Sequence, residues 1–171
     1  KLPNYIRFFF INIFCLFIFL FILRVIFYFL FINGLTISSG EVEKALFLGV
    51  RFDLKLAIIA FIPLALFYLI VRNFFKREIF KKLYLGYSTI IYIIVLAFYL
   101  FDYGHYAYLD LRLNANALRF LENLNISTQF VLDSYPVYRG AIGFILFIYI
   151  ITKINSTIYK TYKKRDLTSK R

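Results

Sequence analysis

The sequence of 171 residues has no tryptophan and no methionine, and it has one cysteine and one histidine. Cys15 stands alone, so this chain can build neither a disulfide framework nor a thiolate metal site. The single histidine, His105, excludes most metal and catalytic sites that need two or more imidazoles. We therefore expect no metal site and no cofactor in this chain.

Charge is also scarce, because only 18% of the residues are Asp, Glu, Lys or Arg. Hydrophobic residues make up 62% and the mean hydropathy is +0.75, whereas ordinary globular domains are about 45–50% apolar and about 25% charged. The composition predicts an integral membrane protein. Abundant Phe, Ile, Leu, Tyr, Asn and Lys without Trp or Met favours an AT-rich bacterial genome, and hence the bacterial cytoplasmic membrane.

Four apolar stretches are long enough for membrane helices, which need about 20 residues each. They cover residues 5–32, 54–72, 83–102 and 137–153. The first is too long for the apolar core of a signal peptide. We predict an all-α integral membrane bundle of four transmembrane helices, forming a single membrane domain over residues 1–171. Since the first residue is Lys rather than Met, we expect a segment of a longer protein.

Lys and Arg gather on one side of these four spans. The predicted link 72–82, the tail 153–171 and the residues around Arg7 carry 14 basic residues against two acids, while the other side carries six against seven. This bias predicts that the basic side and both termini are cytoplasmic. Segments 33–53 and 103–136 are then outer. The +12 net charge reports topology and contacts with anionic lipids, so no nucleic-acid partner is expected.

The first outer segment leads into the second span through the stretch LGVRFDLKLAI. Ser38 followed by Glu41 is a capping-box pattern, which predicts a helix that runs on into the span. On that helix Asp53 shares a face with Gly49 and Ala57. Small residues at this spacing let membrane helices approach closely, so we expect Asp53 to face another helix.

Arg24 is the charged residue inside the first span. An intramembrane Arg costs at least ~2.5 kcal/mol unless its side chain reaches the interface or finds a partner. The sequence leaves three alternatives open: snorkelling alone, a buried ion pair with Asp53, or a pair with Asp102.

The second outer segment contains apolar residues at helical spacing over 111–124, which predicts an amphipathic helix lying on the outer leaflet. Arg112 and Arg119 could hold a lipid phosphate, because a guanidinium suits phosphate geometry. Pairs with Asp110 and Glu122 on the surface helix are an equally good interpretation.

His105 lies three residues after Asp102, so the two could form a base and the group that orients it. A hydrogen-bonded structural histidine is the competing interpretation. No nucleophile is placed beside a base, so we expect no catalytic residue in this chain. The outer constellation, which we take as candidates for contact with headgroups, comprises Arg51, Asp53, Asp102, His105, Asp110, Arg112 and Arg119.

Two stretches, GVRFDLK and FDYGHYAYLDLRLNANAL, resemble the N-terminal membrane domain of sulfatase-like lipoteichoic-acid synthases. That family comprises phosphoglycerol and phosphoethanolamine transferases of the alkaline-phosphatase superfamily. The resemblance covers roughly residues 45–120 and adds Tyr106 and Asn114 to the candidates. The matching positions are Gly49, Arg51, Phe52 and Asp53, then Asp102, Tyr106, Arg112 and Asn114.

The resemblance implies an enzyme with five membrane helices and an extracytoplasmic catalytic domain that holds a divalent metal and a Thr or Ser nucleophile. None of those catalytic residues can be placed on this chain. It would instead be the membrane anchor, with membrane lipids, phospholipid headgroups and its own C-terminal catalytic domain as partners. The alternative is a stand-alone, transport-related protein with a polar path lined by Arg24, Asp53 and Asp102. An intramembrane hydrolase fits least well.

Overall fold

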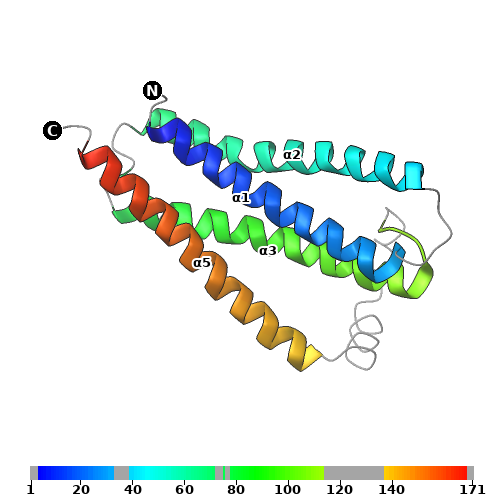
Figure 1. The fold of residues 1–171 in the computed structure, drawn as a ribbon. Coiled ribbons are helices and arrows are strands. Elements are labelled where there is room, and N and C mark those ends of the chain that lie inside the picture. Colours follow the sequence, from blue (N-terminus) through cyan, green and yellow to red (C-terminus); the bar gives the residue numbers. More distant parts are fainter. Residues whose placement is uncertain (1–3, 33–38, 72–74, 76–77, 114–136, 169–171) are drawn as a thin grey trace.

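The computed structural model describes residues 4–32, 39–71, 75, 78–113 and 137–168. Within these ranges all regular structure is helical, and the elements are shown in Figure 1. They are α1 (Asn4–Phe27), the π-helical segment η1 (Tyr28–Ile32), α2 (Ser39–Ile70), α3 (Glu78–Leu109) and α5 (Val137–Thr168). The prediction of an all-α bundle is confirmed.

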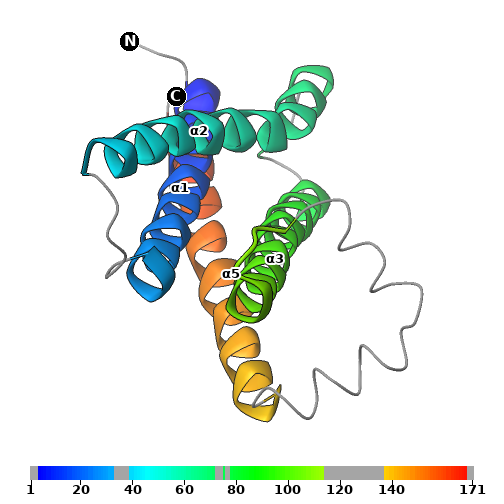
Figure 2. The same ribbon diagram turned by 90° about the vertical axis from the view of Figure 1, so that its right-hand side faces the viewer.

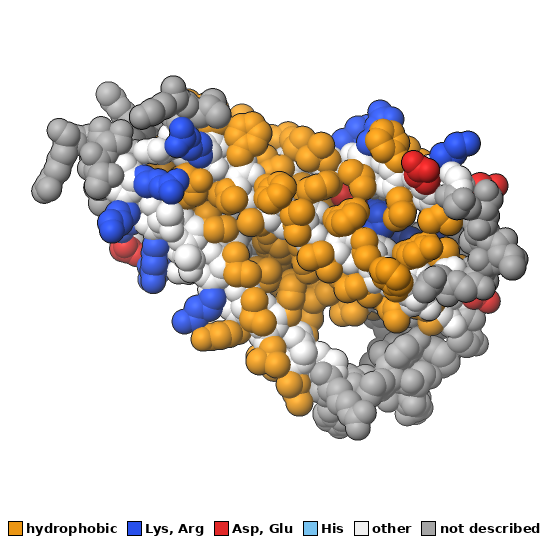
Figure 3. All heavy atoms as spheres, viewed as in Figure 1, with side chains coloured by type: hydrophobic (Ala, Val, Ile, Leu, Met, Phe, Trp, Pro, Cys, Tyr) orange, Lys and Arg blue, Asp and Glu red, His pale blue; other side chains and the backbone are white. Residues whose placement is uncertain are grey.

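In the described part of the chain, four stretches are long and apolar enough to cross a membrane: Asn4–Ile32, Gly40–Ile70, Glu78–Ala107 and Ile142–Arg165. At 1.5 Å per residue, even the shortest exceeds the ~30 Å hydrocarbon core of a bilayer. Hydrophobic side chains cover the middle of the molecular surface, and most of the visible Lys and Arg side chains lie toward its two ends (Figure 3). The chain is therefore a multi-pass membrane protein.

Helix α1 is the centre of the bundle, because it contacts α2, α3 and α5. Figures 1 and 2 show it between α2 and the pair formed by α3 and α5. Its buried residues recur every three or four positions, which gives one continuous stripe along the helix. They are Phe8, Phe9, Asn12, Leu16, Leu20, Leu23 and Phe27.

Both chain termini lie at the same end of the molecule (Figure 1), which we call the basic end. Here α1 and α3 begin and α2 and α5 end, and aromatic rings fill the centre. Phe8 lies 5.0 Å from Tyr84, and Tyr84 stacks on Tyr159 at 5.6 Å between ring centroids. Exposed Lys and Arg surround this cluster: Arg7, Lys82, Lys153, Lys160, Lys164 and Arg165. That this end is cytoplasmic stays a prediction.

At the basic end α3 and α5 are also joined by charge. Glu78, the first residue of α3, receives hydrogen bonds from Lys163 of α5 at 2.8 Å and from Lys81 at 3.3 Å. From there the two helices run antiparallel and separate toward the first residues of α5 (Figures 1 and 2). The packing between them is therefore concentrated near the basic end.

Candidate functional site

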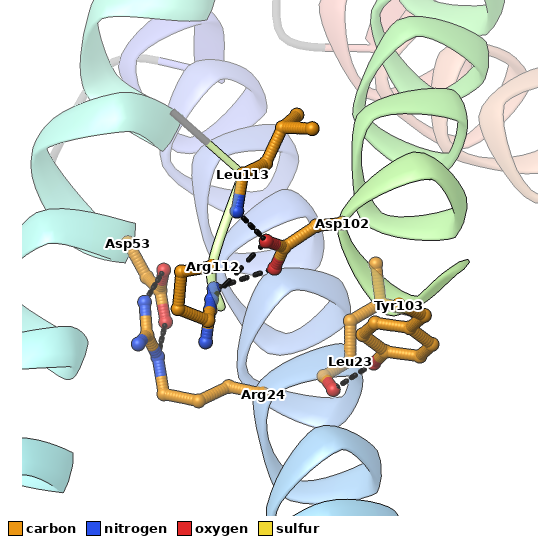
Figure 4. A network of polar contacts seen from close by, with 7 residues as sticks. All are labelled: Leu23, Arg24, Asp53, Asp102, Tyr103, Arg112 and Leu113. Carbon is orange, nitrogen blue, oxygen red and sulfur yellow. Dashed lines mark hydrogen bonds and ion pairs between the residues drawn. The ribbon is translucent and has the colours of Figure 1, made fainter. Parts of the chain in front are cut away.

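The end of the bundle opposite the basic end contains two ion pairs, and we call it the ion-pair end (Figure 4). In the first, Arg24 of α1 meets Asp53 of α2. Arg24 Nε donates to Asp53 Oδ2 at 2.8 Å and Nη2 donates to Oδ1 at 2.7 Å. Asp53 is 3% exposed, whereas the Arg24 side chain is 23% exposed. The sequence left three alternatives open for Arg24, and in the structure Arg24 forms the ion pair with Asp53.

Helix α2 has space for the Arg24 guanidinium beside Gly49. Gly49, Asp53 and Ala57 are all buried and lie on one face of α2 at four-residue spacing. A Cβ atom added to Gly49 would lie 2.4 Å from both Cζ and Nη1 of Arg24. The small residue therefore makes room for a charged side chain at the contact between α1 and α2.

The second ion pair joins Asp102 of α3 to Arg112, which follows the end of that helix. Arg112 Nη2 lies 2.7 Å from Asp102 Oδ2, and Arg112 Nε donates to Oδ1 at 3.2 Å. The backbone amide of Leu113 also donates to Oδ1, at 2.8 Å. Three donors thus surround a carboxylate that is 7% exposed. Arg112 pairs with Asp102 and not, as one interpretation of the sequence had it, with Asp110.

A left-handed turn brings Arg112 back to Asp102. Helix α3 ends at Leu109, and Asp110 has a φ of 54° while its amide donates to the Tyr106 carbonyl at 2.9 Å. A residue in this conformation commonly ends a helix and reverses the chain, and Asp tolerates it better than most non-glycine residues. The turn directs residues 111–113 along the last turns of α3.

Aromatic contacts attach this turn to α1. The Arg112 guanidinium lies over the Phe27 ring, 4.2 Å from its centroid, in a cation–π contact. The same ring packs against Tyr106 at 5.0 Å and Tyr103 at 5.7 Å. The Tyr103 hydroxyl donates to the Leu23 carbonyl, one residue before Arg24 (Figure 4). Helices α1 and α3 are thus joined beside both ion pairs.

Tyr99 is a partly buried residue of α3 close to Asp102, and its ring packs edge-on against Tyr103 at 5.9 Å between ring centroids. Sequence reasoning missed Tyr99, Tyr103 and Phe27 as parts of this site. The signal was present but weak: Tyr99 and Tyr103 are one helical turn apart and flank Asp102, in a chain with 15 tyrosines.

The remaining candidates are placed less centrally. Arg51 is exposed on α2, away from the face that holds Asp53. His105 is partly buried on α3, but both oxygens of Asp102 are bonded by Arg112 and Leu113. Tyr106 packs against Phe27 and Phe31.

Some candidates lie outside the described residues, namely Asn114, Arg119 and Glu122. Of the amphipathic helix predicted over 111–124, only residues 111–113 are described, and these three are not helical, because the chain turns at Asp110 instead. The boundary predicted for the start of that helix is therefore wrong.

Chemically, the two ion pairs consist of two arginines and two aspartates, so their charges balance. Each carboxylate occupies Nε and Nη2 of its arginine, which leaves Nη1 of each guanidinium outside the pair. Nη1 of Arg24 lies against Gly49, but the Arg112 side chain is 52% exposed. Of the two paired arginines, Arg112 is therefore the one that can donate hydrogen bonds to an external phosphate or carboxylate. Among the described residues, no group of three His, Cys, Asp or Glu side chains could hold a metal ion.

No protein-family model matches the sequence, and no curated protein or solved structure is significantly similar to it. The resemblance to sulfatase-like transferases therefore stays a prediction that depends on the motif residues.

Proposed function

We propose that this chain is the membrane-anchoring, lipid-facing domain of a sulfatase-like phosphoglycerol or phosphoethanolamine transferase. The observation that supports this proposal most is that the two motifs of the resemblance lie at the same end of the bundle. Asp53 comes from the first motif, Asp102 and Arg112 from the second, and all three take part in the two ion pairs, while Gly49 of the first motif lies against Arg24. A divalent metal and the nucleophile would belong to a catalytic domain outside this chain.

An anchor for such a domain needs a well-defined surface at one end of its helices. Here Asp53 fixes α2 to α1, and Tyr103 fixes α3 to α1. Asp102 then fixes the segment that leaves α3. Charge-assisted and bidentate hydrogen bonds of this kind are the strong ones, and they hold a specific geometry. These contacts support a rigid platform at the ion-pair end.

The platform would contact lipid headgroups through Arg112. Its side chain is half exposed, it is oriented by Phe27 on one side and Asp102 on another, and it keeps Nη1 outside the ion pair. A guanidinium held in one orientation suits a phosphate diester, which is the group shared by all glycerophospholipids. Arg112 would therefore position the headgroup that the catalytic domain transfers.

The transport alternative needs a polar path across the bundle. Arg24, Asp53 and Asp102 are all engaged in pairs at one end. Between these pairs and the polar residue Asn12, the buried stripe of α1 consists of leucines: Leu16, Leu20 and Leu23. Transporters usually bind substrate near the midplane, at interrupted helices, so this arrangement favours the anchor.

The proposal is tested on the complete protein. Its coding sequence is expected to continue past Arg171 into a soluble sulfatase-like domain, and the purified protein is expected to transfer a labelled headgroup from phosphatidylglycerol or phosphatidylethanolamine. Replacing residues 1–171 by an unrelated four-helix anchor should leave hydrolysis of a soluble phosphodiester intact but reduce transfer from lipid. A coding sequence without any such domain would exclude the proposal.

A further inference from the structure

A buried polar layer lies where α1, α3 and α5 meet, close to the basic end. It consists of Asn12, Tyr84, Ser88 and Asn155, each at most 1% exposed. Asn12 is satisfied within the protein, because Nδ2 donates to the Phe8 carbonyl at 2.7 Å and Oδ1 accepts from the Tyr84 hydroxyl at 2.6 Å.

Asn155 has the same side chain and the same burial, but a different environment. Its Nδ2 makes no hydrogen bond to any residue in the described part of the chain. A buried amide left without an acceptor costs about 1–3 kcal/mol, and within a bilayer bulk water cannot compensate it. Most buried side-chain polar atoms have a partner in the protein or in ordered water, so this amide requires one.

Two neighbouring contacts show what lies opposite Asn155. Tyr84 of α3 stacks on Tyr159 of α5, and the hydroxyls of Thr89 and Thr152 lie 3.3 Å apart. In sequence Asn155 lies between Tyr159 and Thr152, one turn from each. Ser88 likewise lies one turn after Tyr84 and next to Thr89. Because α3 and α5 are antiparallel, the register places Ser88 and Asn155 opposite each other between these two contacts.

We propose that an ordered water molecule binds between α3 and α5 at this level and bridges Asn155 Nδ2 to the Ser88 hydroxyl. Water can accept the amide hydrogen and donate to the hydroxyl oxygen at the same time. The four side chains of the layer are uncharged, so they offer nothing to neutralise an ion. Internal waters of this kind typically make about three hydrogen bonds to buried polar groups that would otherwise be unsatisfied.

The water would join α3 and α5 between the Tyr84–Tyr159 and Thr89–Thr152 contacts, before the two helices separate. The water would form a hydrogen bond with the buried Asn155 side chain, as the Phe8 carbonyl and the Tyr84 hydroxyl do with the Asn12 side chain. The two asparagines are therefore a matched pair: equally buried, at the same end of the bundle, one bonded to protein and one to water.

The test is water-edited solid-state NMR of the intact chain in lipid bilayers, with Asn12 as the internal control. Magnetisation from water should reach the side-chain amide of Asn155 severalfold faster than that of Asn12, with Asn155→Leu used to assign its signal. Ser88→Ala should slow the transfer to Asn155 and leave Asn12 unchanged. Equal transfer rates for the two amides, or a rate at Asn155 that does not respond to Ser88→Ala, would overturn the proposal.

Discussion

Arg24 and Asp53 are 29 residues apart in the chain, yet two parallel hydrogen bonds of 2.7 and 2.8 Å join them inside the bundle. The bonds connect the last turns of α1 to the middle of α2. The Arg24 guanidinium fits there because Gly49, one turn before Asp53, has no side chain. Three sequence features that look unrelated, an arginine in an apolar run, an aspartate and a glycine, thus form a single interaction. The first two predictions below depend on it.

Removing either member of this pair should destabilise the bundle. Arg24→Leu leaves the Asp53 carboxylate buried and unpaired, which costs about 3 kcal/mol or more in comparable buried pairs. Asp53→Asn removes that charge, so the double variant should unfold at a higher temperature than Arg24→Leu alone. Thermal unfolding in detergent for the four members of the cycle measures the coupling. Damage in the double variant equal to the sum of the two single effects would show that the two residues act independently.

Gly49→Ala should weaken the same pair. The added methyl would lie 2.4 Å from the guanidinium, so Arg24 must move away from its bidentate position. Gly86→Ala is the matched control, because nothing lies within 4 Å of its added Cβ and Ala is favoured over Gly in a helix by about 1 kcal/mol. We expect a lower unfolding temperature for Gly49→Ala and an unchanged or higher one for Gly86→Ala. In the Arg24→Leu/Asp53→Asn background the Gly49 substitution should cease to be harmful.

The turn at Asp110 should be sensitive to the shape of its residue. With a φ of 54°, Asp110→Gly relieves a steric cost, whereas Asp110→Val should add about 1–2 kcal/mol. A damaged turn also moves Arg112 away from Asp102. Limited proteolysis after α3, followed together with thermal unfolding, should show earlier cleavage for the Val variant only. Identical behaviour of the Gly and Val variants would mean that the turn does not depend on this conformation.

Arg112 should contribute to binding of anionic phospholipid. We expect Arg112→Gln to lower the number of phosphatidylglycerol molecules that stay bound to the protein in native mass spectrometry. Arg51→Gln removes the same charge from an exposed position on α2 and serves as the control. Equal losses in the two variants would indicate nonspecific attraction to a cation instead of a site beside Phe27.

The ion-pair end is predicted to face the outside of the cell. Because Cys15 is the only cysteine, Cys15→Ala provides a background for labelling. A membrane-impermeant thiol reagent added to intact cells should label Arg51→Cys, and should label Lys164→Cys only after the cells are opened. Both positions are exposed; Arg51 lies two residues before Asp53 on α2, and Lys164 lies in the last turns of α5, which ends at the basic end. The reverse pattern would invert the topology, and labelling of both in intact cells would contradict four crossings.

Much of the fold follows from the sequence because the length of an apolar run determines whether it can cross a bilayer. The helices themselves extend beyond the predicted spans: α2 begins at Ser39 and α5 continues to Thr168. Hydropathy identifies only the part of a helix that contacts lipid. The helix itself can continue into the interface, because its backbone hydrogen bonds do not depend on the hydropathy of the side chains. The position of Asp53 on the face of Gly49 and Ala57 was likewise predictable, since helical periodicity alone decides it.

The partners of the polar groups were harder to predict. Asp102 accepts from Arg112 and Leu113 because Asp110 reverses the chain, and a single left-handed residue leaves no periodic signal. Asn12 bonds to Tyr84 across 72 residues, a distance over which periodicity carries no information. Tyr99 and Tyr103 were hard to single out, because the sequence contains 15 tyrosines and tyrosine is generally enriched at membrane interfaces.

The bond between α1 and α2 also bears on how the protein is made. Ribosomes deliver α1 to the insertion machinery first, with a cation near its trailing end and the carboxylate that neutralises it still untranslated. On translocon-based scales an arginine at a helix centre costs about 2.5–3.5 kcal/mol, and the many Phe, Ile and Leu residues of α1 outweigh this cost. We therefore expect α1 to integrate by itself, and Arg24 to gain its neutralising partner only when α2 follows.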